Sequence, residues 1–454
     1  MKQDDSVKNL LHVYGGPAPR YTSYPPATQF APARPSDSYR DFLLALPEGQ
    51  NISLYLHIPF CRSMCSYCGC MTRIVHDDGP ILDYVRLLEK EINLVATTLG
   101  HRHKVSHIHF GGGSPNLLQR DDLNLLLTNI RANFALAPDA EIAMEADPRQ
   151  LTRDKAFDYA RSGITRVSLG VQDFQENTQK AINRLQPFSQ IESCVRWLRE
   201  ADIGGINFDL MYGLPYQSVE SIADNIQKAI SLGPDRVALF GYAHVPWMKP
   251  HQKTLEKYAL PNSVERYAQA EMARAMLLRG GYAAIGMDHF AKESDSMLAA
   301  YETGAIKRNF QGYTNDSAPA LLGFGLSAIS KVQTAYVQNT TSFGAYKERL
   351  EKGIFPDERW IHISADDRLR GGIIETLMCY FKADCAEICK KHEFSIDYLD
   401  RDLQKLAMME QDGLVKIRDR TVTVTEAGAP FVRAIATCFD AYYEEGTSRH
   451  ARAV

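Results

Sequence analysis

The sequence lacks long apolar runs, an excess of charge of one sign and a high cysteine content. No segment of the 454 residues reaches the roughly 18 uninterrupted apolar residues of a membrane helix. Lys and Arg number 51 against 55 Asp and Glu, a net charge of −4, which argues against a chain built to coat nucleic acid or anionic lipid. The nine cysteines are too few for a disulfide-rich scaffold. We therefore expect a globular protein with neither a nucleic-acid nor a membrane partner.

The amino terminus also lacks the features of a secretory signal. It reads MKQDDSVKNLLHVYGG, with two acids soon after the first lysine and no long apolar stretch. We therefore expect a cytoplasmic protein. In that compartment thiols stay reduced, so clustered cysteines bind a metal or take part in chemistry more often than they form disulfides.

Proline is abundant only in the first part of the chain. Seven prolines between Pro17 and Pro47 fix the backbone φ angle and remove hydrogen-bond donors. They predict an extended, irregular arm over residues 1–50. Its aromatic side chains predict that the arm lies against the main body.

From residue 51 to residue 250, short runs of β-forming residues alternate with helical patterns. Apolar stripes at spacings of three and four over Leu82–Val95, Leu123–Ile130 and Ile222–Ile230 predict helices. Six strand–helix units in series predict an α/β fold with parallel strands, a partial (β/α)6 barrel with its chemistry at the carboxyl ends of the strands. The six predicted strands are Ile52–His57, Val105–Gly111, Glu141–Ala146, Arg166–Gln172, Gly205–Tyr212 and Arg236–Val245.

The regularity ends near residue 250. Residues 251–365 are interpreted as an extension of the barrel with aromatic and polar substrate loops at Met287–Phe290 and Asn309–Tyr313. Residues 366–454 are mostly helical in pattern, and the alternating segment Gly413–Thr425 predicts a β-hairpin, as in a small winged-helix-like domain. This domain carries 13 Lys and Arg against 16 Asp and Glu. A DNA-binding domain needs a basic face, which this acidic balance does not provide. We therefore interpret the domain as a lid or wall over the substrate.

Four of the nine cysteines lie within ten residues, directly after the first predicted strand. The thiols of Cys61, Cys65 and Cys68, at spacings of four and three, can hold an iron–sulfur cluster and leave one iron open. A zinc site fits less well because it needs four ligands in two pairs, and a redox pair of Cys65 and Cys68 is a further alternative. The spacing leaves three roles open for Cys70: a fourth cluster ligand, a residue beside the substrate, or a side chain that packs within the loop. The other five cysteines are expected to pack in the core.

This cysteine motif, flanked by His57–Phe60 and by Gly69–Cys70, resembles that of the oxygen-independent coproporphyrinogen III oxidases in the radical S-adenosylmethionine (SAM) superfamily. The resemblance extends over nearly the whole chain. Its further segments are Pro19–Pro25, Gly111–Ser114, Val171–Phe174, Gly286–Phe290 and Arg308–Thr314. It implies a [4Fe–4S] cluster on the three cysteines, with the methionine part of SAM on the fourth iron.

The resemblance also implies two molecules of SAM. The positions that match contacts to the SAM on the cluster are Tyr55, Gly112, Glu145 and Ile329. Those that match contacts to the second SAM are Tyr67, Gly113, Ser114, Gln172, Arg184, Asp209 and Ala243. Two residue types depart from the family, because Ser114 replaces a usual Thr and some relatives have Phe at Tyr67. Independently, Glu145 and Asp209 are acids in apolar strands and need a partner, either a ligand or a structural salt bridge.

The substrate implied is coproporphyrinogen III, which carries four propionates and needs apolar walls and a few cations. Candidate substrate residues are Arg20, Tyr21, Tyr24, Cys70, Phe290, Arg308, Phe310 and Tyr313. The implied reaction is an anaerobic oxidative decarboxylation to protoporphyrinogen IX in haem biosynthesis, started by a 5′-deoxyadenosyl radical that removes a propionate β-hydrogen. We expect an electron donor such as flavodoxin or ferredoxin. We also expect the protein to be a monomer.

Three other functions were weighed against this one. A related haem-binding chaperone would keep the barrel but lack Cys70, the amino-terminal arm and Asn309–Thr314. A haem-degrading radical SAM enzyme would share the cysteine spacing but not all the flanking motifs. A nucleic-acid-binding regulator would bind through the carboxy-terminal domain. The excess of acidic residues in that domain argues against this function.

Overall fold

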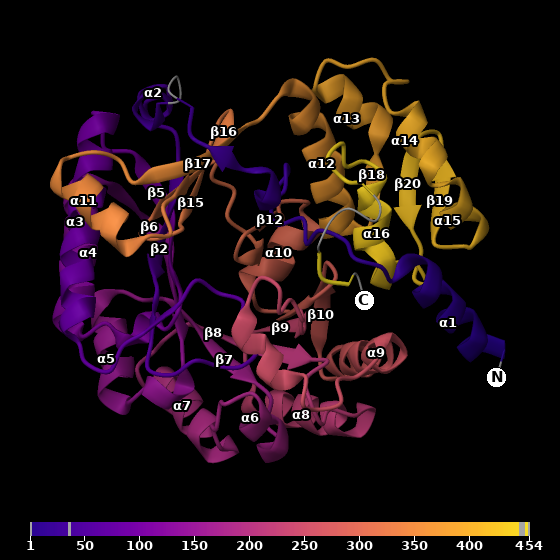
Figure 1. Ribbon diagram of the computed structural model, residues 1–454, viewed down its shortest axis with the longest axis horizontal. Coiled ribbons are helices and arrows are strands. Elements are labelled where there is room, and N and C mark those ends of the chain that lie inside the picture. Colours follow the sequence, from indigo (N-terminus) through magenta and orange to yellow (C-terminus); the bar gives the residue numbers. More distant parts are fainter. Residues whose placement is uncertain (1, 35–37, 445–449, 453–454) are drawn as a thin grey trace.

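Six parallel strands form the centre of the molecule. The computed structural model describes residues 2–34, 38–444 and 450–452, so Pro35 of the predicted arm lies outside the described residues. The central strands follow one another in sheet order as they do along the chain (Figure 1). They are β2 (Ile52–Ile58), β5 (Lys104–Gly112), β6 (Ala135–Ala146), β7 (Arg166–Gln172), β8 (Gly205–Tyr212) and β9 (Arg236–Gly241). The predicted (β/α)6 arrangement is therefore confirmed.

Helices cover the outer face of this curved sheet (Figure 1). They form where the apolar stripes predict them, and Ser218 caps α8 by accepting a hydrogen bond from the backbone N–H of Ser221. The helices of this part are α3 (Gly79–Leu99), α4 (Arg120–Asn133), α5 (Arg153–Ser162), α6 (Glu176–Ala181), α7 (Phe188–Glu200), α8 (Val219–Leu232) and α9 (Ser263–Arg279).

The two faces of the central strands have different chemistry. Side chains such as Leu54, Ile108 and Phe208 are at most 1% exposed and pack in the main hydrophobic core. The alternate positions carry polar groups, which line a cavity on the inner face of the sheet. Along the register Ser53 pairs with His107, and His107 with Glu141. The strand period of two therefore gives the inside of the partial barrel its polar lining.

Antiparallel strands extend the sheet at both ends. The full order is β1-β17-β16-β15-β14-β2-β5-β6-β7-β8-β9-β11-β10, and β14 pairs with β2 in parallel. The first and last strands of this order are not paired with each other in the described part of the chain, so the barrel stays open. The added strands are β1 (Ala31–Pro32), β10 (Tyr282–Ile285), β11 (His289–Lys292), β14 (Ala320–Phe324), β15 (Ile329–Val332), β16 (Ala335–Asn339) and β17 (Asp357–His362).

Two segments interpreted as loops are in fact parts of β-hairpins. His289 and Phe290 belong to β11, which pairs with β10, and the segment Asn309–Tyr313 joins β12 (Lys307–Asn309) to β13 (Gly312–Thr314). Small elements complete this region. They are β3 (Phe60–Cys61), β4 (Arg73–Ile74), α10 (Ser296–Glu302), α11 (Phe343–Glu351) and a 3-10 helix, η4 (Pro250–Leu255).

The expectation of an extended amino-terminal arm is wrong for its first part. Lys2–Tyr14 form helix α1, and Tyr39–Leu44 form α2. The prolines begin only at Pro17, so nothing interrupts a helix before that point. The arm does lie against the main body, because the backbone N–H of Ala18 donates to the carbonyl of Ala451 over 3.2 Å.

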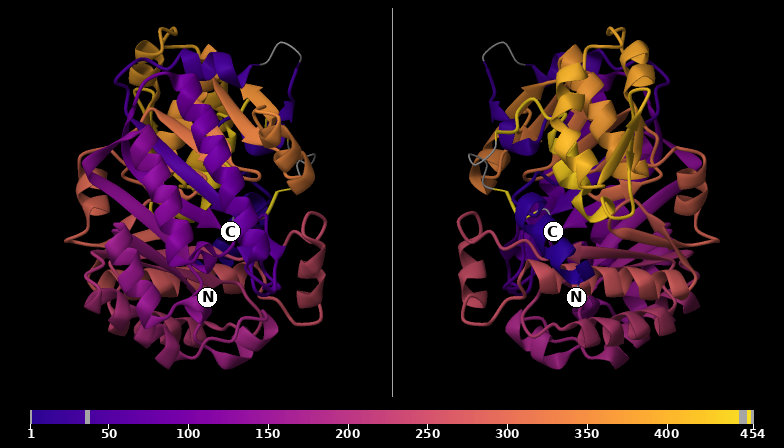
Figure 2. Two further views of the ribbon diagram at one scale, coloured as in Figure 1. Left: turned by 90° about the vertical axis from the view of Figure 1, so that its left-hand side faces the viewer. Right: turned by 90° about the vertical axis from the view of Figure 1, so that its right-hand side faces the viewer.

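The carboxy-terminal segment forms a second hydrophobic core with the arm. In both views of Figure 2 it lies at the upper end of the molecule. The predicted hairpin is confirmed, since β19 (Val415–Arg418) pairs with β20 (Thr421–Val424), and β18 (Lys382–Asp384) joins them. The helices here are α12 (Ala365–Tyr380), α13 (Cys385–Lys391), α14 (Asp400–Lys405), α15 (Ala407–Gln411) and α16 (Val432–Thr437).

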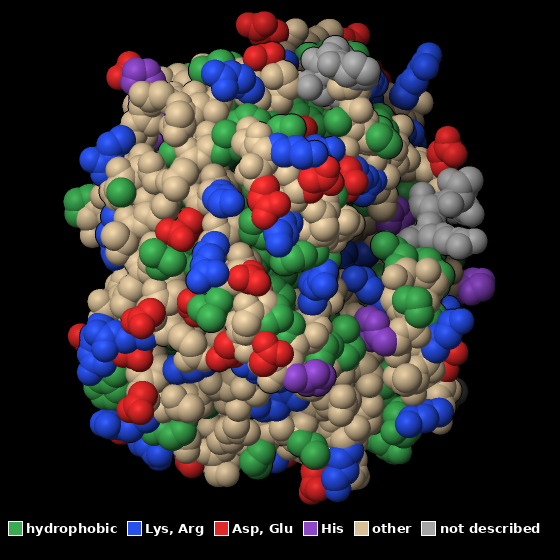
Figure 3. Space-filling model, turned by 60° about the vertical axis from the view of Figure 1, so that its left-hand side comes forward, with side chains coloured by type: hydrophobic (Ala, Val, Ile, Leu, Met, Phe, Trp, Pro, Cys, Tyr) green, Lys and Arg blue, Asp and Glu red, His purple; other side chains and the backbone are tan. Residues whose placement is uncertain are grey.

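Basic and acidic side chains are interspersed on the face drawn in Figure 3, so this face has no large patch of one charge. Across the described residues, no helix has both the length and the apolar character that crossing a bilayer requires.

Candidate active site

The cysteine loop lies at the carboxyl end of the first parallel strand, where the sequence predicted it. Cys61 belongs to β3, which begins two residues after β2 ends, and its Sγ lies 3.2 Å from the hydroxyl of Ser114. The rest of the loop is held by hydrogen bonds. The backbone N–H of Ser66 donates to Ile182 over 2.9 Å, and the Asn183 side chain donates to the Met64 carbonyl over 2.8 Å.

The thiols of Cys68 and Cys61 have different environments. A hydrogen bond from Cys70 lowers the pKa of Cys68 to about 6, whereas burial raises the pKa of Cys61 to about 11. Among the described residues no three His, Cys, Asp or Glu side chains are close enough to hold a single ion. A cube-shaped cluster binds each thiolate through a different iron, so its ligands stand further apart than those of one zinc ion. Cys61, Cys65 and Cys68 offer three thiols on one loop, the donor chemistry that holds a [4Fe–4S] cluster.

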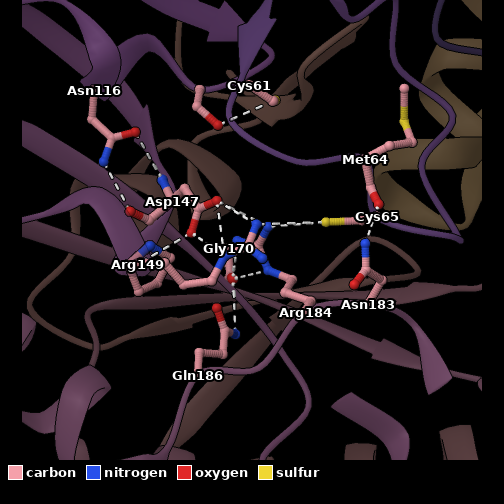
Figure 4. A network of polar contacts seen from close by, with 12 residues as sticks. Cys61, Met64, Cys65, Asn116, Asp147, Arg149, Gly170, Asn183, Arg184 and Gln186 are labelled. Atoms are coloured by element: carbon pink, nitrogen blue, oxygen red, sulfur yellow. Dashed lines mark hydrogen bonds and ion pairs between the residues drawn. The ribbon is translucent and has the colours of Figure 1, made fainter. Parts of the chain in front are cut away.

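Two arginines aim at the sulfur of Cys65 (Figure 4). Arg184 Nη1 lies 3.5 Å and Arg149 Nη2 lies 3.7 Å from Cys65 Sγ. Asp147 holds both guanidinium groups, at 2.7 Å from Arg149 and 3.5 Å from Arg184. Burial alone would raise the pKa of Asp147, but the two arginines hold it below its ordinary value. This arrangement brings positive charge and N–H donors to one predicted cluster ligand.

Glu145, on the third parallel strand, contacts the glycine turn that follows the second parallel strand. Its Oε2 accepts a hydrogen bond from the backbone N–H of Gly112 over 3.0 Å, and its Oε1 lies 3.2 Å from His109 Nε2. Burial opposes ionisation, yet these contacts lower the pKa of Glu145. The ring of Tyr55 stacks on His109 with centroids 5.9 Å apart. The predicted residues Tyr55, Gly112 and Glu145 are thus neighbours.

Gly112 is a position that a larger residue would disturb. Its φ is +112°, in the region that favours glycine, and an added Cβ would lie 2.6 Å from Cε1 of His57. Gly113 is equally tight, since a Cβ there would lie 2.7 Å from the carbonyl oxygen of Phe60. Both positions therefore require glycine, because the His57 ring and the Phe60 backbone pack directly against the turn.

A second group of predicted residues gathers around the fourth strand. A Cβ on Gly170 would lie 2.9 Å from both Gln172 Nε2 and Arg184 Nη2, so these two side chains meet there. The charge of Arg184 also acts on the buried hydroxyl of Tyr67. Within the part of the chain that the structure describes, Asp209, one strand further, has only the hydroxyl of Ser168 as a donor at 3.3 Å, and burial raises its pKa to about 7. This carboxyl group is available to a ligand.

Glu145, His109 and Asp209 line a large cavity of about 730 Å³ on the inner face of the sheet. The strands, the hairpin after residue 306 and the carboxy-terminal segment all contribute to its wall. The predicted residues that line it are Arg20, Cys70, Glu145, Asp209, Ala243, Phe290, Arg308, Phe310 and Tyr313.

The amino-terminal ends of the strands contribute paired charges to the same cavity. Arg166 contacts Glu141 at 3.0 Å and Asp295 at 3.1 Å, while Arg236 contacts Asp295 at 2.7 Å. These ion pairs are mutually balanced, so we interpret them as the structural floor of the cavity.

The other predicted residues, among them Cys61, Cys65, Cys68, Gln172 and Arg184, are not part of the cavity wall, and neither are Tyr21, Tyr24 and Ile329. Tyr21 donates its hydroxyl to Asp440 over 3.0 Å, and the Tyr24 hydroxyl accepts the N–H of Ala441 over 2.8 Å. Both rings belong to the second hydrophobic core, where burial and these bonds hold them. Ile329 begins β15 and packs beside Phe310 in a smaller apolar cluster.

The sequence reasoning missed Asp147, Arg149, His109 and Arg266. Asp147 and Arg149 follow directly after β6, the place where the barrel rule puts chemistry, so a signal for them did exist. The other cysteines behave as expected. Cys194, Cys379, Cys385, Cys389 and Cys438 are all buried free thiols.

Comparison with known proteins identifies the family. The model of the radical SAM superfamily matches residues 55–229. A protein of Bradyrhizobium diazoefficiens named oxygen-independent coproporphyrinogen III oxidase is 45% identical over 96% of this chain and 97% of its own length. The chain belongs to the family of oxygen-independent coproporphyrinogen III oxidases.

Other members of this family agree. The Escherichia coli protein of the same name is 36% identical over 98% of this chain and 97% of its own length. A solved structure of coproporphyrinogen III oxidase from Escherichia coli, described as a radical SAM enzyme, has a TM-score of 0.88 and 35% identity, covering 93% of this chain and 98% of that one. The fold prediction is confirmed, and the protein is a radical SAM oxidoreductase that uses a [4Fe–4S] cluster and SAM.

Proposed function

We propose that this protein converts coproporphyrinogen III to protoporphyrinogen IX without oxygen, as the names of its relatives indicate. The observation that carries the proposal is the position of the cysteine loop. It stands at the carboxyl ends of the parallel strands, and Cys70 of that loop lines a cavity of about 730 Å³. This volume is within the range of cofactor and ligand sites, which bury most of a bound molecule.

Each predicted group has a defined task in this proposal. Cys61, Cys65 and Cys68 would hold the cluster. When reduced and bound, the cluster and SAM supply the 5′-deoxyadenosyl radical that removes a hydrogen from a propionate β-carbon. The chain orients these groups and excludes water. Glu145, held as a carboxylate by Gly112, would accept hydrogen bonds from the amino group of SAM.

A second SAM molecule is part of the proposal. Gln172 and Arg184 meet at Gly170, and Asp209 keeps a carboxyl group without a strong donor. A buried carboxyl group such as that of Asp209 is costly unless a partner satisfies it. The residues assigned to the second SAM are Tyr67, Gly113, Ser114, Gln172, Arg184, Asp209 and Ala243, and those assigned to the first are Tyr55, Gly112, Glu145 and Ile329.

The substrate would occupy the part of the cavity that the aromatic hairpins line. Phe310 and Tyr313 supply apolar surface there, and Arg20 and Arg308 supply positive charge. Cys70 reaches the same space. We further propose that an electron carrier of the flavodoxin or ferredoxin type reduces the cluster, that the chain acts as a monomer, and that its parts divide near residues 50, 250 and 365.

The comparisons favour this function over a haem-binding chaperone or a haem-degrading enzyme. Nothing in the site favours a nucleic-acid-binding role. The test is to reconstitute the cluster anaerobically and add SAM, a reductant and coproporphyrinogen III. The expected products are protoporphyrinogen IX and two molecules of CO₂. Cleavage of SAM with no decarboxylated tetrapyrrole would overturn the substrate assignment.

A further inference from the structure

Three arginines from distant parts of the chain meet at one end of the cavity. Arg20 comes from the arm, Arg266 from α9 and Arg308 from β12. Arg20 Nη2 donates to the carbonyl of Gly241 over 3.2 Å, and a Cβ on Gly241 would lie 2.9 Å from Arg266 Nη2. Arg308 Nε donates to the backbone carbonyl of Arg20 over 3.3 Å. Their guanidinium groups therefore border the same part of the cavity, where β9 ends.

This cluster has more positive charge than the one nearby acid, Asp288, can balance. Within residues 2–34, 38–444 and 450–452, neither Arg20 nor Arg266 forms an ion pair with an Asp or Glu side chain. Arg308 has only Asp288, at 3.9 Å, and Asp288 makes a closer contact of 2.7 Å with His289. The arginines on the cavity floor differ in this respect, because each of them contacts acids directly. The excess of positive charge is therefore local to the end of β9.

Two of the guanidinium groups also keep unused donors. Arg266 Nε and Arg308 Nη1 are buried and have no hydrogen-bond partner among the described residues. The Arg308 side chain is only 4% exposed, and both arginines line the cavity. An unsatisfied charged donor that is buried costs free energy, so a ligand that accepts its hydrogen bond would be bound favourably.

Repulsion between like charges acts on Arg20. Burial lowers the pKa of Arg20 below its ordinary value, and the charges of Arg308 and Arg266 add to this effect while that of Asp288 opposes it. Burial and the charge of Arg452 do the same for the pKa of Arg266. An anion placed between these groups relieves the repulsion. Guanidinium groups bind carboxylates in a two-pronged geometry, so a carboxylate is the anion that fits best.

We infer that Arg20, Arg266 and Arg308 form a carboxylate-binding site that holds propionates of the tetrapyrrole, with Arg266 as a specificity-determining residue. The inference rests on the proposed function and adds where the substrate's negative charge is held. The site borders β9, the sixth parallel strand, whereas the cysteine loop follows β2, the first. It therefore anchors the substrate's negative charge beside β9, next to the segment whose His251 contacts the carbonyl of Cys68 over 2.8 Å.

The test measures binding to the full chain with its cluster, separately from turnover. The probes are coproporphyrin III, which has four propionates, mesoporphyrin IX, which has two, and SAM. The variants are Arg266→Gln, Arg266→Lys and Arg20→Gln. Arg161→Gln is the control, since that side chain is 59% exposed in an ion pair with Asp158. Cluster absorbance shows that each variant is folded, and Arg20→Gln serves if Arg266→Gln does not fold.

We expect Arg266→Gln to weaken coproporphyrin III binding at least tenfold and mesoporphyrin IX binding less. Arg266→Lys should recover part of the loss, while SAM binding and the control stay within twofold of the wild type. Unchanged porphyrin binding in Arg266→Gln and Arg20→Gln would overturn the inference. Weaker SAM binding with unchanged porphyrin binding would also overturn it, since the site would then hold the methionine carboxylate of SAM.

Failure of the proposed function has a different signature. A wild type that binds coproporphyrin III but does not decarboxylate coproporphyrinogen III would contradict the reaction, and the binding differences among variants would still test the arginine site. A wild type that binds neither porphyrin would overturn the arginine site, while turnover of coproporphyrinogen III alone decides the reaction.

Discussion

Replacing Asp147 by Asn should destabilise the folded chain strongly. The Asp147 and Arg184 side chains are 6% and 8% exposed, and Arg149 is 18% exposed. Asn keeps the shape of Asp147 but removes the charge that faces both arginines. Removing one partner of a buried ion pair costs about 3–5 kcal/mol, and Asn can still accept one hydrogen bond, so we expect the lower part of that range at pH 7.

The assay is urea unfolding of wild type and Asp147→Asn. The matched control is Asp83→Asn, which breaks an ion pair with Arg86 whose side chains are 71% and 72% exposed. An exposed pair of this kind contributes about 0–1 kcal/mol. Equal losses in the two variants would refute the claim that Asp147 holds two buried arginines.

The pH dependence gives a second check on Asp147. Because its pKa is lowered in the folded chain, the ionised carboxylate stabilises the fold above the unfolded-state pKa, and this contribution is lost as pH falls through the folded-state pKa. The difference between wild type and Asp147→Asn should therefore shrink below about pH 4. A constant difference across that range would contradict the assigned charge.

Three further predictions concern separate features. Burial raises the pKa of Glu91 from 4.5 to about 7, so its contribution to stability should fall by about 3 kcal/mol as pH rises from 4.5 through 7. Glu91→Gln should flatten that slope in urea unfolding. Gly112→Ala should weaken SAM binding at least tenfold in calorimetry and leave cluster absorbance intact, whereas Gly344→Ala, with no atom within 4 Å of the added Cβ, should change neither. Ser variants of the three predicted ligands should each lose the visible absorbance of the cluster, and Cys70→Ser should keep much of it; complete loss there would make Cys70 a ligand. The predicted ligands are Cys61, Cys65 and Cys68.

The central strands could be predicted because their signal is local. Each run of β-forming residues lies between turns and helical stripes, and β7 and β8 match the predicted limits. The edge strands carry no such signal. β14 has five residues and pairs with β2, which lies far away in the sequence, so its pairing depends on contacts that a local pattern does not contain.

Helix α1 could have been found with more attention to spacing. Val7, Leu10, Leu11 and Tyr14 recur at the helical interval and face the second hydrophobic core. The prolines that suggested an extended arm all come later in the chain. Composition averaged over residues 1–50 therefore hid a regular element in its first third.

The candidate site divides in the same way. The cysteine ligands are close in sequence, so their spacing is informative. The arginines of the site are not close to the cysteines in sequence, so no spacing reveals them. Arg184 is 119 residues from Cys65, and Arg266 reaches the cavity only through the folding of α9. Arg20 and Arg308 entered the prediction through the resemblance to a family, and their proximity to Arg266 needed the structure.

The most direct measurement of the central claim follows one hydrogen atom. Coproporphyrinogen III deuterated at the propionate β-carbons is offered to the reconstituted protein with SAM and a reductant. The account predicts that the 5′-deoxyadenosine released carries deuterium and that protoporphyrinogen IX forms with it. Unlabelled 5′-deoxyadenosine alongside decarboxylated product would contradict hydrogen removal from the propionate by the radical.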